Sequence, residues 1–183
     1  MDYVKSFKQS KVIKYLFIAL IGSIFLAISS KVKIPFYPVP MTMQTFVVLF
    51  IGIAFGWKLG VATVSLYLLE GIIGMPVFSG TPEKGLGLIY FTGPTMGYLI
   101  GFIFAVYLSG KFTYNNNILM NFLKLSFAVS IIYILGLFWL GTLIGWDKPI
   151  FQLGAQPFLL AELFKLSIAS IALNKIKKLR KFI

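Results

Sequence analysis

The sequence contains neither cysteine nor histidine. Without cysteine the chain has no disulfides and no thiol chemistry, and without both residue types it lacks the usual protein ligands of zinc and haem iron. The P-loop pattern G-x-x-x-x-G-K-[ST] is also missing, so nothing in the sequence indicates ATP hydrolysis by this chain. These absences argue against a thiol enzyme, and we expect no resident metal or cofactor.

Charged residues are scarce as well. They make up 12% of the chain and only 5 residues are acidic, whereas soluble domains carry about 25% charged residues. Hydrophobic residues account for 58% of the sequence, and the mean hydropathy is +0.91. The composition therefore predicts an all-α integral membrane protein, in which 183 residues leave room for roughly five to seven spans but not for an additional soluble domain.

Six apolar windows divide the chain, separated by segments such as "PFYPVP", "GWKLG" and "GWDKP". The first 30 residues also resemble a signal peptide, but the charge distribution described next favours a retained span. We expect residues 1–183 to form one membrane domain. Its transmembrane helices are predicted at about 12–30, 41–56, 59–74, 94–110, 118–144 and 157–174, followed by a basic tail at 175–183.

Positive charge is distributed unevenly over this topology. Six spans put both termini on one side, and that side receives most of the Lys and Arg residues. The loops on the other side hold only Lys31, Lys33, Lys84 and Lys148. The positive-inside rule therefore places both termini in the cytoplasm, in a multi-pass protein of the cytoplasmic (inner) membrane. The net charge of +12 indicates contact with membrane lipid and not with nucleic acid.

Two charged residues, Glu162 and Lys165, lie within the last apolar window, in "PFLLAELFKLS". Each costs roughly 2.5–3.5 kcal/mol at mid-bilayer depth on insertion scales. Their spacing of three puts them on one helix face, and with Pro157 as the first helical residue Lys165 lies about 12 Å along the helix. Three interpretations stay open: a structural ion pair, a polar ligand clamp or ion path, and an acid–base pair in an intramembrane enzyme.

The outer loops are rich in Pro, Gly and aromatic residues but poor in charge, which indicates structured caps over a site. Gln44, in "PVPMTMQTF", places an amide where it must find a partner at low dielectric. Phe78 and Tyr98, beside the loops "GMPVFSG" and "FTGPTMGY", offer flat surfaces, and Tyr98 adds a polar tip. Glu70, near the outer end of the third helix, is either an interfacial anchor or a functional group.

Small residues recur at spacings of four in two predicted helices. Ala19, Ser23 and Ala27 form such a stripe in the first helix, and Gly97 and Gly101 form a pair in the fourth. Small residues at this spacing let another helix approach closely. The glycine pair is interpreted as helix packing, and the partner of the first stripe is either internal or another subunit.

Four segments stand out in order along the chain: "PVPMTMQTF", "GIIGMPVFSG", "GPTMGYLIGF" and "PFLLAELFK". In this order and at these spacings they resemble the BioY family of biotin transporters, and the likeness covers about residues 12–174. The resemblance implies the S-component fold and a biotin pocket that opens outward. It further implies that Glu162 and Lys165 contact the ureido ring, although many members carry Asp in place of Glu162. Gln44, Phe78 and Tyr98 are candidates for the pocket.

The same resemblance implies partner subunits, and it leaves alternative functions open. S components work with a transmembrane T subunit and separate ATPases, and the T subunit is expected to contact Ala19, Ser23 and Ala27, with Ser in the middle of the family's Ala-x-x-x-Ala. A homo-oligomer is an alternative assembly. Lys84 is a candidate for the biotin carboxylate. The rival functions are an S component for a different vitamin, an intramembrane enzyme that uses Glu162 and Lys165, and a structural assembly protein.

Overall fold

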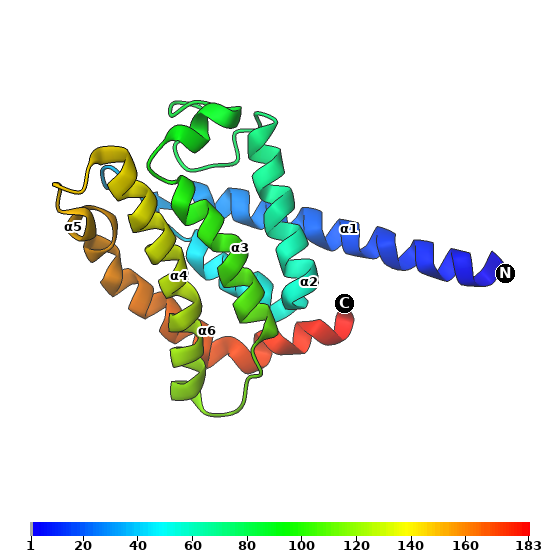
Figure 1. Cartoon of the computed structure of the whole chain (residues 1–183). Coiled ribbons are helices and arrows are strands. Elements are labelled where there is room, and N and C mark those ends of the chain that lie inside the picture. Colours follow the sequence, from blue (N-terminus) through cyan, green and yellow to red (C-terminus); the bar gives the residue numbers. More distant parts are fainter. Residues whose placement is uncertain (1) are drawn as a thin grey trace.

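The computed structural model describes residues 2–183, with side chains from Lys11 onward, and it is mainly helical. Figure 1 shows α3 between α2 and α4, with α1 and α6 running across them. The elements in chain order are α1 (Asp2–Lys31), β1 (Lys33–Ile34), β2 (Met41–Thr42), α2 (Gln44–Ile72), η1 (Gly87–Thr92), α3 (Met96–Lys111), α4 (Ile118–Ile144), α5 (Ile150–Gly154), η2 (Gln156–Phe158), α6 (Leu159–Lys178) and η3 (Leu179–Phe182).

The segment α2 consists of two helices that meet at Gly56. This residue has φ 77° and ψ 170°, a backbone conformation open to glycine but rarely to other residues. The two halves then pack against each other, because a Cβ placed on Gly60 would lie 3.6 Å from the Cα of Gly52. The halves match the predicted spans at 41–56 and 59–74. Together with α1, α3, α4 and α6 they give six membrane helices, which confirms the predicted number.

The start of α6 differs from the prediction. Pro157 was expected to be the first helical residue, but it lies in the 3₁₀ turn η2 and the α-helix begins at Leu159. The tighter i→i+3 bond from the Phe158 N–H to the Ala155 carbonyl closes this turn before the α-helical bonds begin. Glu162 therefore lies in the first turn of α6, where the positive end of the helix dipole favours a carboxylate.

Glycines allow α2, α3 and α4 to approach one another closely. A Cβ on Gly52 would lie 2.0 Å from the Ser109 hydroxyl of α3. A Cβ on Gly97 would lie 2.3 Å from the Leu135 carbonyl of α4, and one on Gly101 would lie 2.6 Å from the Cα of Ile132. Real side chains do not fit at these distances. The pair Gly97 and Gly101 is thus a helix-packing pair, as the sequence indicated.

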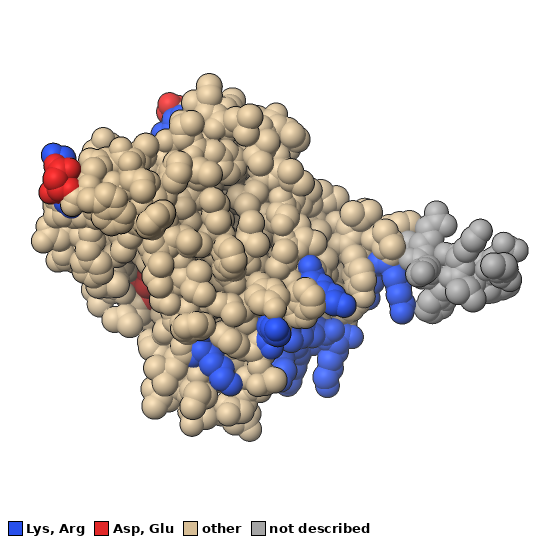
Figure 2. Space-filling model, in the orientation of Figure 1, with Lys and Arg blue, Asp and Glu red and all other residues tan. Residues whose placement is uncertain are grey.

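The surface carries large apolar side chains and few charges. Phe17 and Phe25 on α1, and Phe138 on α4, are each about three-fifths exposed, which suits contact with lipid and not with water. Figure 2 shows Lys and Arg gathered along the side of the molecule near the C-terminal tail, and a few charges of both signs at the opposite end. This uneven distribution of positive charge agrees with the predicted orientation, in which both termini face the cytoplasm.

The basic tail also makes a specific contact inside the chain. Arg180 donates from Nε to the Ile53 carbonyl at 2.6 Å and from Nη2 to the carbonyls of Gly52 and Gly110 at 3.0 and 2.9 Å. These carbonyls belong to the last turns of the first half of α2 and of α3, where helices lack internal partners. Arg180 therefore holds two helix ends together, a role that the sequence alone did not indicate.

Candidate functional site

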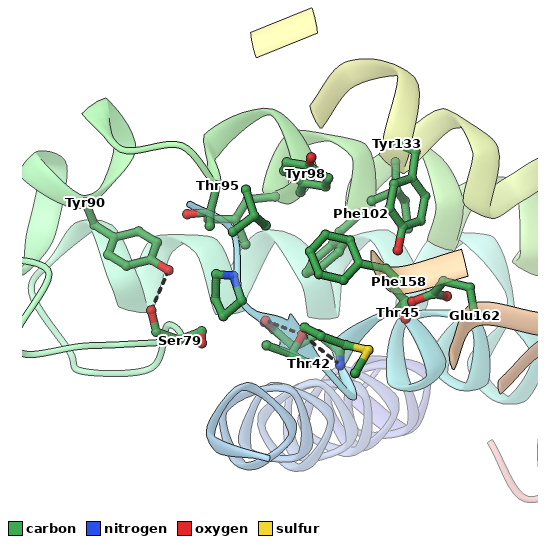
Figure 3. Close-up of a pocket in the computed structure, with 16 residues that line it drawn as sticks. Thr42, Thr45, Ser79, Tyr90, Thr95, Tyr98, Phe102, Tyr133, Phe158 and Glu162 are labelled. Carbon is green, nitrogen blue, oxygen red and sulfur yellow. Dashed lines mark hydrogen bonds between the residues drawn. The ribbon is translucent and has the colours of Figure 1, made fainter. Parts of the chain in front are cut away.

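A narrow cavity lies where β2 and the start of α2 meet α3, α4 and α6 (Figure 3). Its volume is about 50 Å³, which is room for a few water molecules. Gln44, Tyr98 and Glu162 line it, so the structure brings together three residues that the sequence singled out. Residues from the outer loop, including Ser79 and Tyr90, close its outer side.

The buried pair Glu162 and Lys165 lies at one end of this cavity. Both residues are only 5% exposed, and the Lys165 Nζ lies 2.7 Å from Glu162 Oε1. The same ammonium donates to the Thr45 hydroxyl at 3.0 Å and to the Thr42 carbonyl at 2.6 Å. An ammonium has three N–H donors, so the protein itself occupies all of them. Lys165 does not line the cavity, whereas Glu162 does.

Thr45 contacts both members of the pair, although the sequence did not mark it as a site residue. Its hydroxyl donates to Glu162 Oε1 at 2.8 Å and accepts from Lys165. The bonds from Thr45 and Lys165 therefore both reach Oε1. Tyr133 of α4 was also missed; its hydroxyl points toward Glu162 in Figure 3. Thr45 and Tyr133 each place a hydroxyl within an apolar span, and this is the sequence signal that could have identified them.

Gln44 connects this end of the cavity to the outer loop. Its side-chain N–H donates to the Tyr67 hydroxyl at 2.7 Å, and Tyr67 donates in turn to the Val77 carbonyl at 3.1 Å. Its Oε1 accepts from the Thr42 hydroxyl at 3.2 Å. Because the Thr42 carbonyl binds Lys165, a continuous polar path runs from α6 through β2 and α2 to the loop that covers the cavity.

Tyr98 forms part of the apolar wall. Its ring lies against Gly136 of α4, where an added Cβ would come within 2.4 Å of ring carbons. Its hydroxyl donates to the Gly154 carbonyl at 2.8 Å, so the polar tip is held away from any ligand. Phe102 and Phe158 line the cavity beside it. These rings form the apolar part of the cavity wall.

Phe78 lies one layer behind the cavity and does not line it. Its ring stacks on Tyr90 at a centroid distance of 4.7 Å and meets Tyr67 edge-on at 5.2 Å. A Cβ on Gly71 would overlap the same ring at 2.0 Å. Phe78 thus supports the wall that Tyr90 forms, and the sequence could not distinguish these two layers.

The loop around residues 77–81 is fixed by hydrogen bonds to its backbone. The Val77 carbonyl accepts from Ser30 at 2.7 Å, the Phe78 carbonyl from Lys31 at 2.9 Å, and the Ser79 carbonyl from Tyr90 at 2.7 Å. Among the described residues, the buried Ser79 Oγ has no hydrogen-bond partner in the protein, and Ser79 lines the cavity. A buried hydroxyl without a partner needs one, so this oxygen is available to a polar ligand.

Lys84 lies in a second, outer cavity of about 290 Å³. Tyr90 and Thr95 line both cavities, so the outer one adjoins the inner one. Partial burial, together with the positive charge of Lys33, lowers the pKa of Lys84 below its usual value. An anion beside Lys84 would stabilise its charged form and so oppose this lowering of the pKa.

Comparison with known proteins identifies the family. A sequence model of the BioY family matches residues 4–182. The chain belongs to the BioY family. It is 30% identical over 158 residues to a probable biotin transporter BioY of Pyrococcus horikoshii, an alignment that covers 85% of this chain and 93% of that one. It is 34% identical over 155 residues to the biotin transporter BioY of Thermotoga maritima, covering 84% and 90%.

The fold of this BioY-family chain also matches a crystal structure. The S-component for biotin from an ECF-type ABC transporter superposes with a TM-score of 0.76 at 24% identity, covering 92% of this chain and 93% of that one. This likeness confirms the predicted S-component fold. It assigns no ligand contact to individual residues.

The small-residue stripe of this BioY-family chain faces inward. Ser23 is fully buried and donates to Glu70 Oε1 of α2 at 2.8 Å. Ala19 is buried, Ala27 is partly buried, and a Cβ on the neighbouring Gly22 would lie 2.5 Å from a Thr63 methyl. The stripe therefore packs against the second half of α2 within the chain. Its contact with a T subunit stays a prediction.

Proposed function

We propose that this chain captures biotin at the outer side of the cytoplasmic membrane as the substrate-binding component of an ECF-type importer. The observation that carries the proposal is the buried pair Glu162 and Lys165 at the end of a cavity with aromatic walls, in a chain of the BioY family. Curated relatives are named biotin transporters, which favours binding and uptake over turnover by an enzyme.

The polar end of the cavity fits the ureido ring of biotin. A cyclic urea presents two N–H donors and one carbonyl acceptor. Glu162 Oε2, which takes no part in the bonds to Lys165 and Thr45, accepts one N–H. The ureido carbonyl takes a donor from the Tyr133 hydroxyl, which lines the cavity beside Glu162, or replaces one existing acceptor of Lys165.

This arrangement gives Lys165 a positioning role. All three of its donors are used inside the protein, and two of them hold Glu162 and Thr45 in place. The ammonium lies directly beside the carboxylate, whose oxygens are the acceptors for ligand donors. We therefore assign the direct ligand contact to Glu162 and its support to Lys165 and Thr45.

The apolar walls fit the remainder of the ligand. Tyr98, Phe102 and Phe158 surround the space available to the thiophane ring and valeryl chain. Nanomolar affinity, about −12 kcal/mol over roughly 16 heavy atoms, requires nearly complete enclosure. A cavity of about 50 Å³ is too narrow for such a ligand, so we expect the residues that line it to move apart when biotin binds. Lys84 lines the outer cavity, and we assign the valeryl carboxylate to this side chain.

Transport requires energy that we assign to other chains, a T subunit and ATPase subunits. A T subunit that docks on Ala19, Ser23 and Ala27 must first displace the second half of α2. One that docks on the exposed face of α1, at Leu16 or Leu20, leaves the chain unchanged. Cross-links from introduced cysteines at Leu20 or at Ser23 distinguish the two modes, because the chain has no cysteine of its own.

Uptake of labelled biotin by cells that lack their own importer tests the proposal. Cells that express the chain together with T and ATPase subunits should accumulate biotin, and unlabelled biotin, but not riboflavin or thiamin, should compete. The recovered biotin should be chemically unchanged. Competition by another vitamin, or conversion of the ligand, would replace the proposal with one of its rivals. Expression of the chain alone shows whether a homo-oligomer suffices.

A further inference from the structure

A wide groove lies on the basic side of the molecule, far from the candidate biotin site in the fold. The groove has a volume of about 560 Å³. It is lined by Tyr15 of α1, by residues around the Gly56 break and by Ile183. Phe55, Trp57, Leu59 and Ala62 make its lining mainly apolar. The groove joins α1, α2 and the C-terminal tail at the end of the bundle where the Lys and Arg residues gather (Figure 2).

One edge of this groove is cationic. The Lys58 Nζ lies 5.5 Å from the centre of the Trp57 ring, and both residues line the groove. Lys11 lies one helical turn before Tyr15 and therefore on the same face of α1. No acidic side chain lines the groove among the residues that the structure describes. The groove thus combines an apolar channel with a positively charged rim.

We propose that this groove binds an anionic phospholipid. Its acyl chain lies along Leu59 and Ala62, and its phosphate lies beside Lys58, with Trp57 at the depth of the headgroups. Tryptophan favours this interfacial depth, and Lys residues near the surface attract anionic lipid. The apolar channel distinguishes this ligand from a water-soluble phosphate compound, which would gain nothing from it, and the cationic rim distinguishes it from a zwitterionic lipid.

Lipid retention, measured by native mass spectrometry of the purified full chain, tests this assignment. The protein is exchanged into detergent with equal amounts of phosphatidylglycerol and phosphatidylcholine. Wild-type protein should retain phosphatidylglycerol preferentially. Lys58→Gln should reduce that preference about fivefold, since one lysine near a membrane surface contributes about that factor, and Lys58→Arg should keep it. Ala62→Trp, which fills the channel, should lower retention of both lipids.

Lys111→Gln is the matched control. The Lys111 Nζ also lies near an aromatic ring, 5.3 Å from the centre of Tyr107 and 2.9 Å from its hydroxyl, but Lys111 does not line the groove. Equal retention of the two lipids by wild-type protein would overturn the proposal, as would equal losses in Lys58→Gln and Lys111→Gln. Displacement of the lipid by millimolar glycerol phosphate would show a simple phosphate site and also overturn it. The proposal would also be overturned if the groove retained no lipid and instead became covered when a T subunit binds.

Discussion

Replacing Lys165 with methionine should destabilise the fold and abolish biotin capture together. Lys165 donates hydrogen bonds to the Thr42 carbonyl, the Thr45 hydroxyl and Glu162 Oε1 at 2.6, 3.0 and 2.7 Å. Methionine keeps a similar apolar stem but leaves the carboxylate buried without its counter-charge. Breaking a buried ion pair in this way costs about 3–5 kcal/mol, and we expect that loss in the free energy of unfolding.

The double variant Glu162→Gln with Lys165→Met separates stability from binding. It removes both charges, so no uncompensated charge remains buried, and it should recover most of the lost stability. Biotin affinity should not recover, because an amide in place of the carboxylate offers a weaker acceptor to the ureido N–H groups. We expect a dissociation constant at least about 100-fold weaker than that of wild type, equivalent to about 2.7 kcal/mol.

Denaturant unfolding in detergent micelles and equilibrium binding of labelled biotin give these two quantities. Lys148→Met is the control, because Lys148 and Asp147 form an exposed pair at 3.2 Å that should contribute at most about 1 kcal/mol. If Lys165→Met were as stable as wild type, the buried network would not have the energetic role described. If the double variant bound biotin as wild type does, the ligand assignment of Glu162 would be refuted.

Three further substitutions test separate parts of the structure. Lys84→Gln should weaken the binding of biotin about tenfold but leave the affinity for biotin methyl ester unchanged in a binding titration. Equal losses of affinity for both ligands would show that Lys84 does not bind the carboxylate. Gly136→Ala should push the Tyr98 ring into the cavity, costing about 1–3 kcal/mol of stability and weakening biotin, and unchanged unfolding and binding curves would contradict that packing. Arg180→Gln should lower stability by about 1–3 kcal/mol and speed hydrogen exchange in the turn before Gly56, whereas unchanged exchange there would show that the guanidinium does not hold these helix ends.

The six helices could be predicted because each depends on local sequence. Apolar windows define the spans, and the break in α2 is marked by Gly56 beside Trp57 and Lys58. The start of α6 was misplaced by two residues because a 3₁₀ turn and the first α-helical turn tolerate Pro157 equally well. Local signals determine the type of an element more firmly than its ends.

The clearest signals for the candidate site were polar residues that are unusual in a membrane span. Glu162, Lys165 and Gln44 stood out because their polar groups need partners at low dielectric. Thr45 was not assigned to the site because its partners lie 117 and 120 positions away in the sequence. Phe78 was placed with the pocket candidates, although Tyr90 is the ring that lines the cavity, since sequence spacing does not show which aromatic ring lies in front.

Calorimetric titration of the purified chain with biotin tests the central claim most directly. We predict one tight site per chain, no heat with riboflavin or thiamin, and loss of the site in Glu162→Gln. A folded, monodisperse wild-type sample that gives no heat and no protection by biotin would contradict the account. Glu162 and Lys165 would then be a structural ion pair within the same six-helix fold.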